Sequence, residues 1–142
     1  RDMFRGDFVI LSYAISMLDL RQLQGDDKVE TGDTLFVTLQ PQGREWTAVA
    51  VAHEKPFAAP GGVALRGTVV SVDSSAAGVP PNQVRVDYGI ESYFVPEGTG
   101  REIEKEAQNG TLSADIAVDP HGRGAIKAMR RNGEAFHVEG IF

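Results

Sequence analysis

The chain has 142 residues, which predicts one domain long enough to bury a core without disulfide or metal staples. It contains no cysteine, so disulfide bonds, thiolate catalysis and cysteine-ligated zinc sites are excluded. The net charge of −6 disfavours general nucleic-acid binding, because an acidic surface repels phosphate backbones.

The first half of the chain alternates strand patterns with turn-rich segments. Side chains alternate with period two over residues 9–17, which predicts a strand, whereas the polar residues 23–33 (LQGDDKVETGD) predict a loop. Residues 34–41 and 46–54 predict two strands joined by the short turn QGRE, and therefore a hairpin. After the break KPFAAPGG, residues 63–72 predict the next strand.

The longest irregular stretch, DSSAAGVPPNQ, precedes a further strand pattern. Residues 84–90 place Val84, Val86, Tyr88 and Ile90 on one face. Gly89 stands where a bulge would redirect the residues that follow it.

One short helix is predicted near residues 100–108. Thr99 and Glu102 have the spacing of a capping box, in which each residue bonds the amide of the other. Gly110 follows as the stop signal.

The end of the chain returns to strand patterns. Residues 112–118 alternate clearly, DPHG predicts a turn, and residues 125–141 predict a hairpin around Asn132-Gly133. The fold class is therefore mainly β: a single antiparallel β domain over residues 1–142, either a sandwich or a partly open barrel, with one short α-helix.

The segment RGDFVILSYAIS resembles the defining motif of the GDYXXLXY protein family. Gly6, Asp7, Leu11 and Tyr13 match the motif, whereas Phe8 replaces its first tyrosine and so lacks that hydroxyl. The later segments LRGTV and YGIESYFVPEGTGREIE resemble the second half of the family in the same order. The resemblance implies a bacterial envelope protein with one N-terminal membrane helix and a domain outside the cytoplasm. It implies no reaction, substrate or cofactor.

The start of the chain agrees with that expectation. The opening RDMFRGDF lacks an initiator Met and runs almost directly into a strand, which indicates a fragment of a longer protein. No apolar run approaches the ~20 residues that span a bilayer, so we expect any membrane anchor to precede Arg1.

The densest polar chemistry lies in and around residues 88–104. Tyrosine, arginine and glutamate side chains beside one turn favour a partner-binding surface or a structural network. Arg66 stands among apolar residues in its strand and needs a carboxylate partner, for which Glu91 and Glu97 are the candidates. The candidate residues of this network are Arg66, Tyr88, Glu91, Tyr93, Glu97, Arg101 and Glu102.

Two catalytic alternatives stay open. Glu91 and Glu97 provide the two carboxylates that glycoside hydrolysis needs, although the sequence leaves their separation undetermined. The segments ISM (residues 15–17) and GDTLFV resemble, faintly, the Ser-Met box and the Gly-Asp strand of signal-peptidase-like serine proteases. In that alternative Ser16 is the nucleophile and Lys55 the base, but the proline expected after Met17 is replaced by Leu18.

Other residue patterns indicate neither a metal nor a cofactor. His53, His121 and His137 lack metal-type spacing, and no glycine motif has the order of a phosphate-binding loop. A basic cluster at Arg123, Lys127, Arg130 and Arg131 is interpreted as a solvated hairpin edge.

The residue patterns therefore favour a noncatalytic binding or scaffold domain. The family resemblance implies that this domain lies outside the cytoplasm and is anchored to the inner membrane in its full-length form. The expected partner is a membrane protein or an envelope ligand. No nucleic acid, cofactor or metal is expected, and the oligomeric state is left open.

Overall fold

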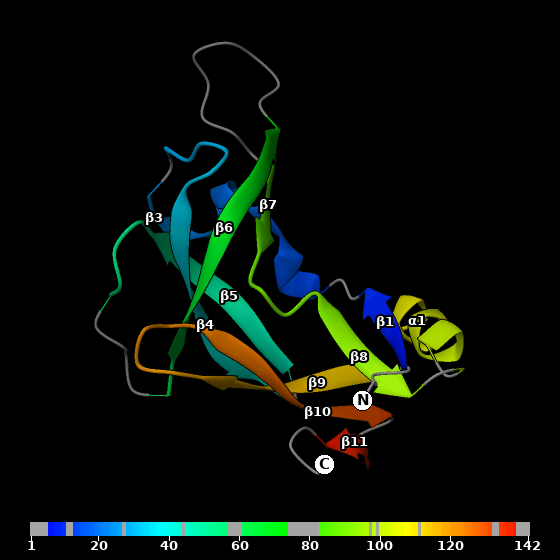
Figure 1. Ribbon diagram of the computed structural model, residues 1–142. Coiled ribbons are helices and arrows are strands. Elements are labelled where there is room, and N and C mark those ends of the chain that lie inside the picture. Colours follow the sequence, from blue (N-terminus) through cyan, green and yellow to red (C-terminus); the bar gives the residue numbers. More distant parts are fainter. Residues whose placement is uncertain are drawn as a thin grey trace. The chain divides into compact units, whose positions relative to one another are not determined.

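The structure is a computed structural model that describes residues 6–10, 13–26, 28–43, 45–56, 61–73, 83–96, 98, 100–110, 112–131 and 134–138 (Figure 1). Of residues 6–10, 93–96 and 136–138 it describes the main chain alone. The chain divides into two compact units: unit 1 comprises residues 1–12, 89–117 and 125–142, and unit 2 comprises residues 13–88 and 118–124. The single domain over residues 1–142 stays a prediction.

Unit 2 contains a six-stranded sheet that curls into a half-barrel, in the order β2-β7-β6-β4-β5-β3. Its strands are β2 (Met17–Asp19), β3 (Gln24–Gly25), β4 (Thr34–Gln42), β5 (Glu45–Ala52), β6 (Val63–Asp73) and β7 (Gln83–Asp87). All of the pairings are antiparallel except that of β3 with β5, which is parallel. The predicted mainly β class and the predicted β4–β5 hairpin are confirmed.

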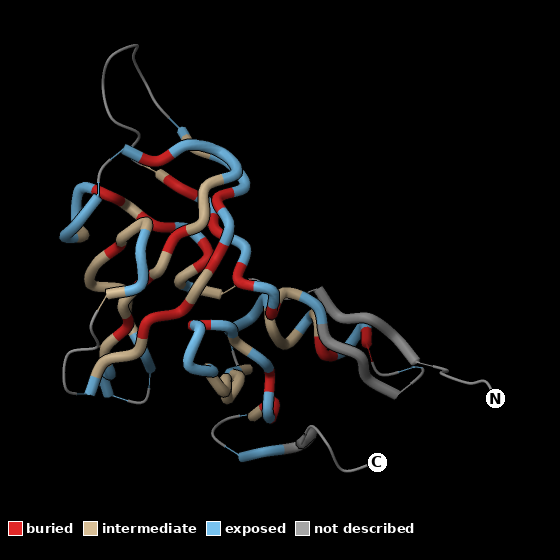
Figure 2. The backbone as a smooth tube through the Cα atoms, turned by 60° about the vertical axis from the view of Figure 1, so that its left-hand side comes forward, coloured by how far each residue is buried: buried red, intermediate tan, exposed pale blue. Residues whose placement is uncertain are grey.

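The core of unit 2 follows from period two along its strands. On β4, Leu35, Val37 and Leu39 are buried and alternate with less buried neighbours, and on β7 Val84 and Val86 do the same. Burial of such side chains is worth roughly 1.5–3 kcal/mol each relative to exposure. Buried residues accordingly recur along the strands of this sheet in Figure 2.

The single strand predicted over residues 9–17 is wrong. The chain instead forms β1 (Gly6–Ile10), a 3-10 turn η1 (Ala14–Ser16) and then β2. The amide of Ser16 donates to the oxygen of Tyr13 at 3.0 Å, and the Ser16 hydroxyl accepts the Tyr13 amide at 3.0 Å. These two bonds close a local turn, which period two does not reveal. A second 3-10 turn, η2 (Leu20–Gln22), is capped by Asp19, whose carboxylate accepts the amide of Arg21.

Unit 1 contains a pair of strands, most of a three-stranded sheet, and the helix. The antiparallel pair is β1 with β8 (Ser92–Pro96), and the sheet has the order β11-β10-β9. Its strands are β9 (Leu112–Val118), β10 (Gly124–Arg131) and β11 (Glu134–Val138). The strand at 112–118 and the hairpin of β10 with β11 confirm the predictions, while Asn132 and Gly133 lie outside the described residues.

The helix α1 (Gly100–Gln108) has the predicted bounds and packs against β1. Ile103 is its buried apolar anchor, and Gly110 ends it with a φ of 76° while donating its amide to Ala107. The capping box stays a prediction, because Thr99 lies outside the described residues. In the described part of the chain, no helix is long and apolar enough to span a membrane.

The strand predicted over residues 84–90 ends at Asp87. All four side chains predicted to share one face are buried, as expected: Val84, Val86, Tyr88 and Ile90. Gly89 has a φ of 81°, a conformation open to glycine, and separates β7 from β8 instead of forming a bulge within one strand.

The basic cluster was predicted to lie at a hairpin edge, but three of its four residues lie on the central strand of a sheet. Arg130, Lys127 and Arg131 belong to β10, which is the central strand of its sheet. Arg130 bonds both oxygens of Asp115 on β9, at 3.0 and 2.8 Å. Because Arg131 also has an acidic partner, described below, the cluster is partly neutralised within unit 1.

Candidate functional site

The residues predicted to form one network are divided between the two units. Unit 2 holds Arg66 and Tyr88, and unit 1 holds Glu91, Tyr93, Arg101 and Glu102. Glu97 and the side chain of Tyr93 lie outside the described residues. The predicted pairing of Arg66 with Glu91 or Glu97, and the separation of the two glutamates, therefore stay predictions.

Tyr88 is a buried structural residue of unit 2. Its side chain is 4% exposed, and its hydroxyl donates to the main-chain oxygen of Ile15 at 2.7 Å. Its ring lies over Gly67, where a Cβ would meet Cδ1 of Tyr88 at 2.9 Å and Cγ1 of Val86 at 2.4 Å. Glycine in the segment LRGTV thus provides the space that the tyrosine occupies.

Glu91 and the first turn of α1 lie in unit 1. The Glu91 carboxylate is half-buried and accepts the amide of Ile90 at 2.9 Å. Arg101 and Glu102 are exposed on α1. One turn further along, Glu106 forms a two-bond ion pair with Arg131 of β10, and this hydrogen bonding lowers the pKa of Glu106.

Arg66 lies on β6 where the β9–β10 turn meets that strand. Its amide donates to the oxygen of Gly122 at 2.7 Å. Within this turn the Asp119 carboxylate accepts the amides of His121 and Arg123 at 2.8 and 2.9 Å, which confirms the turn predicted at DPHG. Both amides lower the pKa of Asp119, that of Arg123 more strongly.

Ser16 and Lys55, the alternative nucleophile and base, each have another partner. The buried Ser16 hydroxyl accepts the amide of Tyr13, and the exposed Lys55 ammonium donates to the main-chain oxygen of Pro120. A Ser–Lys catalytic pair requires a direct hydrogen bond between the two side chains. The hydrogen bonds found among the described residues include none between Ser16 and Lys55.

The motif segment lies in strand β1 and the turn after it. Gly6 and Asp7 pair with Pro96 and Val95 of β8, so two segments that carry the family resemblance are adjacent strands. Tyr13 precedes η1 as its cap, and Leu11 lies outside the described residues.

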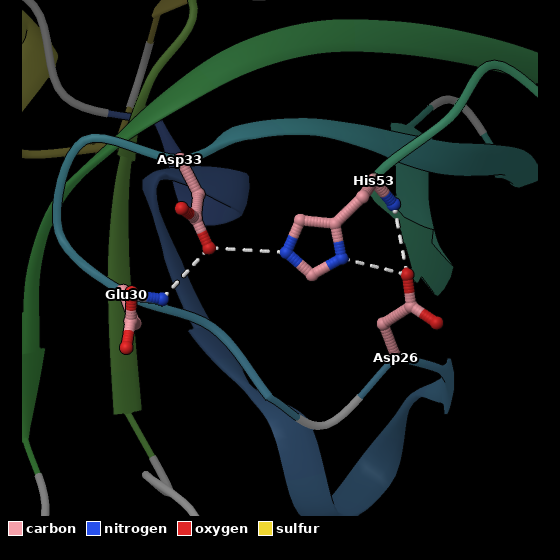
Figure 3. Close-up of polar contacts among 4 residues, drawn as sticks. All are labelled: Asp26, Glu30, Asp33 and His53. Atoms are coloured by element: carbon pink, nitrogen blue, oxygen red, sulfur yellow. Dashed lines mark hydrogen bonds and ion pairs between the residues drawn. The ribbon is translucent and has the colours of Figure 1, made fainter.

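A polar cluster that the sequence did not predict lies in unit 2. The His53 ring is held between two carboxylates: Nδ1 is 2.8 Å from Oδ2 of Asp26, and Nε2 is 3.0 Å from Oδ2 of Asp33 (Figure 3). The His53 amide also donates to Oδ2 of Asp26 at 2.9 Å, and the Glu30 amide donates to Oδ2 of Asp33 at 2.9 Å. We call Asp26, His53 and Asp33 the histidine clamp.

The clamp favours a charged imidazole. The hydrogen bond that the ring donates to Asp26 raises the pKa of His53 most, followed by the one that it donates to Asp33. Bonds to His53 lower the pKa of Asp26, and the amide of Glu30 and the ring of His53 lower that of Asp33. The three side chains are 28–49% exposed, so water screens these interactions substantially.

This geometry suits a structural contact better than catalysis. Both ring nitrogens bond to carboxylates, which leaves neither of them available as a general base. In the described residues, no group of three or more histidine, cysteine or acidic side chains is arranged to hold a metal ion.

Sequence reasoning missed the clamp because its members are 20 and 27 residues apart. One weak signal exists: Gly-Asp occurs at both ends of the polar loop, at Gly25-Asp26 and Gly32-Asp33, and His53 follows a strand. Only the pairing of β3 with β5 and of β5 with β4 brings these three strand ends together.

Comparison with known proteins identifies one family. The family model for the GDYXXLXY protein matches residues 1–129. No curated protein and no solved structure matches the chain significantly.

Proposed function

The chain belongs to the GDYXXLXY protein family, and from that premise we propose that it is a noncatalytic binding or scaffold domain of the bacterial cell envelope. In this proposal the domain lies outside the cytoplasm, and an N-terminal segment of the full-length protein anchors it to the inner membrane. It contacts a membrane protein or an envelope ligand there. The expected location and anchor come from the family resemblance.

One observation carries the noncatalytic part of the proposal: polar groups near the turn after β7 bond to the main chain of the protein itself. The Tyr88 hydroxyl bonds the oxygen of Ile15, and the Glu91 carboxylate bonds the amide of Ile90. A catalytic acid or base must instead reach a substrate. These contacts support a role for the two residues in holding the structure.

The exposed residues of α1 are the proposed contact surface. Arg101 and Glu102 are exposed in the first turn of the helix, while Ile103 is buried and holds the helix in place. Arginine is frequent among residues that dominate binding energy at protein interfaces. A short helix with a buried anchor presents such side chains on a defined scaffold.

Site-specific crosslinking tests the proposed partner contact. A photoreactive residue replaces Arg101 in the full-length protein, in its native envelope, and crosslinked proteins are identified by mass spectrometry. We expect one reproducible membrane-protein partner. The matched control carries the photoreactive residue at the exposed Glu45 of unit 2 and should lack this product. Identical products from both positions, or no product from Arg101, would contradict the proposed surface.

A separate measurement distinguishes the scaffold from the hydrolase. Glu91→Gln should lower the melting temperature, because the carboxylate loses its charge-assisted bond to the amide of Ile90. The release of reducing sugar ends from isolated envelope polysaccharide should be at background for both proteins. If the parent releases sugar ends and the variant does not, at an unchanged melting temperature, the chain is a hydrolase.

A further inference from the structure

The segment between β3 and β4 is tied to β6 by main-chain bonds. We call residues 28–33 the strap. The Gly32 amide donates to the oxygen of Val69, and the Val69 amide donates to the oxygen of Asp33, both at 2.8 Å. Val29 of the strap is 4% exposed and is part of the core of unit 2. The strap therefore covers apolar residues of the half-barrel.

The histidine clamp connects the strap to the end of β5. Asp33, at the end of the strap, bonds Nε2 of His53. Asp26, which lies just before the strap, bonds Nδ1 and the amide of His53, and its own amide donates to the oxygen of Val51 at 3.1 Å. One imidazole thus joins the end of β5 to both sides of the strap (Figure 3).

We propose that the histidine clamp is a pH-dependent latch, which holds the strap to the end of β5 while His53 carries both ring protons and loosens this contact when His53 loses one. The inference is independent of the proposed function.

The chemistry of the ring requires this behaviour. A charged imidazole donates from both nitrogens, whereas a neutral imidazole has one N–H and one lone pair. In the neutral ring, one lone pair would face a carboxylate oxygen at 2.8 or 3.0 Å, which is repulsive. Deprotonation therefore breaks one of the two side-chain bonds.

The charged groups that face His53 in the described structure are the two carboxylates of the clamp. Asp26 follows β3 and Asp33 precedes β4. Beside His53 in its own segment, Lys55 is directed to the oxygen of Pro120, and Glu54 is exposed. Glu30 contributes its amide to Asp33.

The pH range of the closed latch follows from the directions of the pKa shifts. The pKa of His53 is raised, so its stabilising contribution is complete below the ordinary value of 6.5 and is lost as the pH rises through the folded value. The pKa values of Asp26 and Asp33 are lowered, so their contributions are complete above 3.8 and are lost as the pH falls through the folded values. The latch is fully closed between these limits and opens toward alkaline pH.

Hydrogen exchange of the strap amides, measured across this transition, tests the latch. Protection factors are compared at about pH 6 and about pH 9, since they remove the intrinsic pH dependence of exchange. In the parent protein we expect the protection of the strap to fall about threefold or more at the higher pH, a size typical of exposed ion pairs. His53→Gln should show low protection at both values, because glutamine stays neutral.

The matched control is His121→Gln in the exposed β9–β10 turn, which should behave like the parent. Equal protection of the parent strap at both pH values would overturn the proposal, as would loss of the transition in His121→Gln.

A second measurement uses the unaltered protein and so does not depend on a variant that folds. Nuclear magnetic resonance titration follows the His53 ring and the Glu30 amide, which donates to Asp33. We expect one common midpoint above pH 6.5, the ordinary histidine value. A ring that titrates without any change at the Glu30 amide would show that the strap does not respond to His53.

Discussion

The hydroxyl of Tyr88 donates to the main-chain oxygen of Ile15 at 2.7 Å, although 73 residues separate them in the sequence. The bond joins the residue after β7 to the 3-10 turn η1 that precedes β2. Because β2 and β7 are also paired strands, the tyrosine extends the contact between them beyond the ladder.

Tyr88→Phe should destabilise the protein by about 1 kcal/mol, because the bond to Ile15 is lost and its oxygen stays partly buried. Urea unfolding followed by fluorescence measures the change. The control Thr68→Val removes an exposed hydroxyl from the same sheet and should change stability by less than about 0.5 kcal/mol. Equal effects of the two variants would show that the Tyr88 bond is not stabilising.

Gly67→Ala should destabilise by about 1–3 kcal/mol, the cost of overpacking a filled site. The new Cβ would lie 2.4 Å from Cγ1 of Val86 and 2.9 Å from Cδ1 of Tyr88. Val86→Ala removes one of the obstructing atoms, so the double variant should be more stable than the sum of the single effects predicts. Strict additivity in a double-mutant cycle would refute the steric explanation.

Gly25→Ala should be more damaging than Gly32→Ala. Both glycines have positive φ, at 107° and 94°, but a Cβ at residue 25 would lie 2.0 Å from the oxygen of Val51, and one at residue 32 meets nothing within 4 Å. We expect a loss of about 1 kcal/mol for Gly32→Ala from backbone strain alone and at least about 2 kcal/mol for Gly25→Ala. Denaturant midpoints measure both, and equal losses would be inconsistent with the close approach of β3 to β5.

Asp119→Ala should lower the melting temperature at neutral pH, because two amides of the β9–β10 turn lose their acceptor. The pKa of Asp119 is lowered, so its contribution is present above 3.8 and is lost as the pH falls through the folded value. The difference between parent and variant should therefore shrink in acid. Asp119→Asn keeps one acceptor oxygen and should lie between them; a difference that grows in acid would contradict the assignment.

The Arg130–Asp115 pair should contribute little despite its good geometry. Its side chains are 39% and 46% exposed, so Asp115→Asn should cost less than about 1 kcal/mol. About 1 M NaCl should remove most of that difference, since salt screens exposed charges. Stability curves at low and high salt provide the measurement, and a larger, salt-independent loss would indicate a role beyond charge pairing.

Local sequence patterns predicted the elements whose residues interact mainly with their neighbours. The helix at 100–108, the strand at 112–118 and the β4–β5 hairpin were all predicted, because helix signals, period two and short turns act within a few residues. The continuous strand predicted at 9–17 is not formed, because the Ser16 hydroxyl closes a turn by accepting the amide of Tyr13. The alternation of apolar residues does not reveal such a side-chain bond.

The sequence by itself determined the mainly β class, the bounds of α1, the absence of cysteine chemistry and the family to which the chain belongs. Only the tertiary structure decided that His53 lies between Asp26 and Asp33, that Tyr88 reaches Ile15, and that Gly67 makes room for a ring. The reason is physical: these contacts join residues 20 to 73 positions apart. The register of the strands and the pairing of strands distant in the sequence, which no local pattern specifies, bring these residues together.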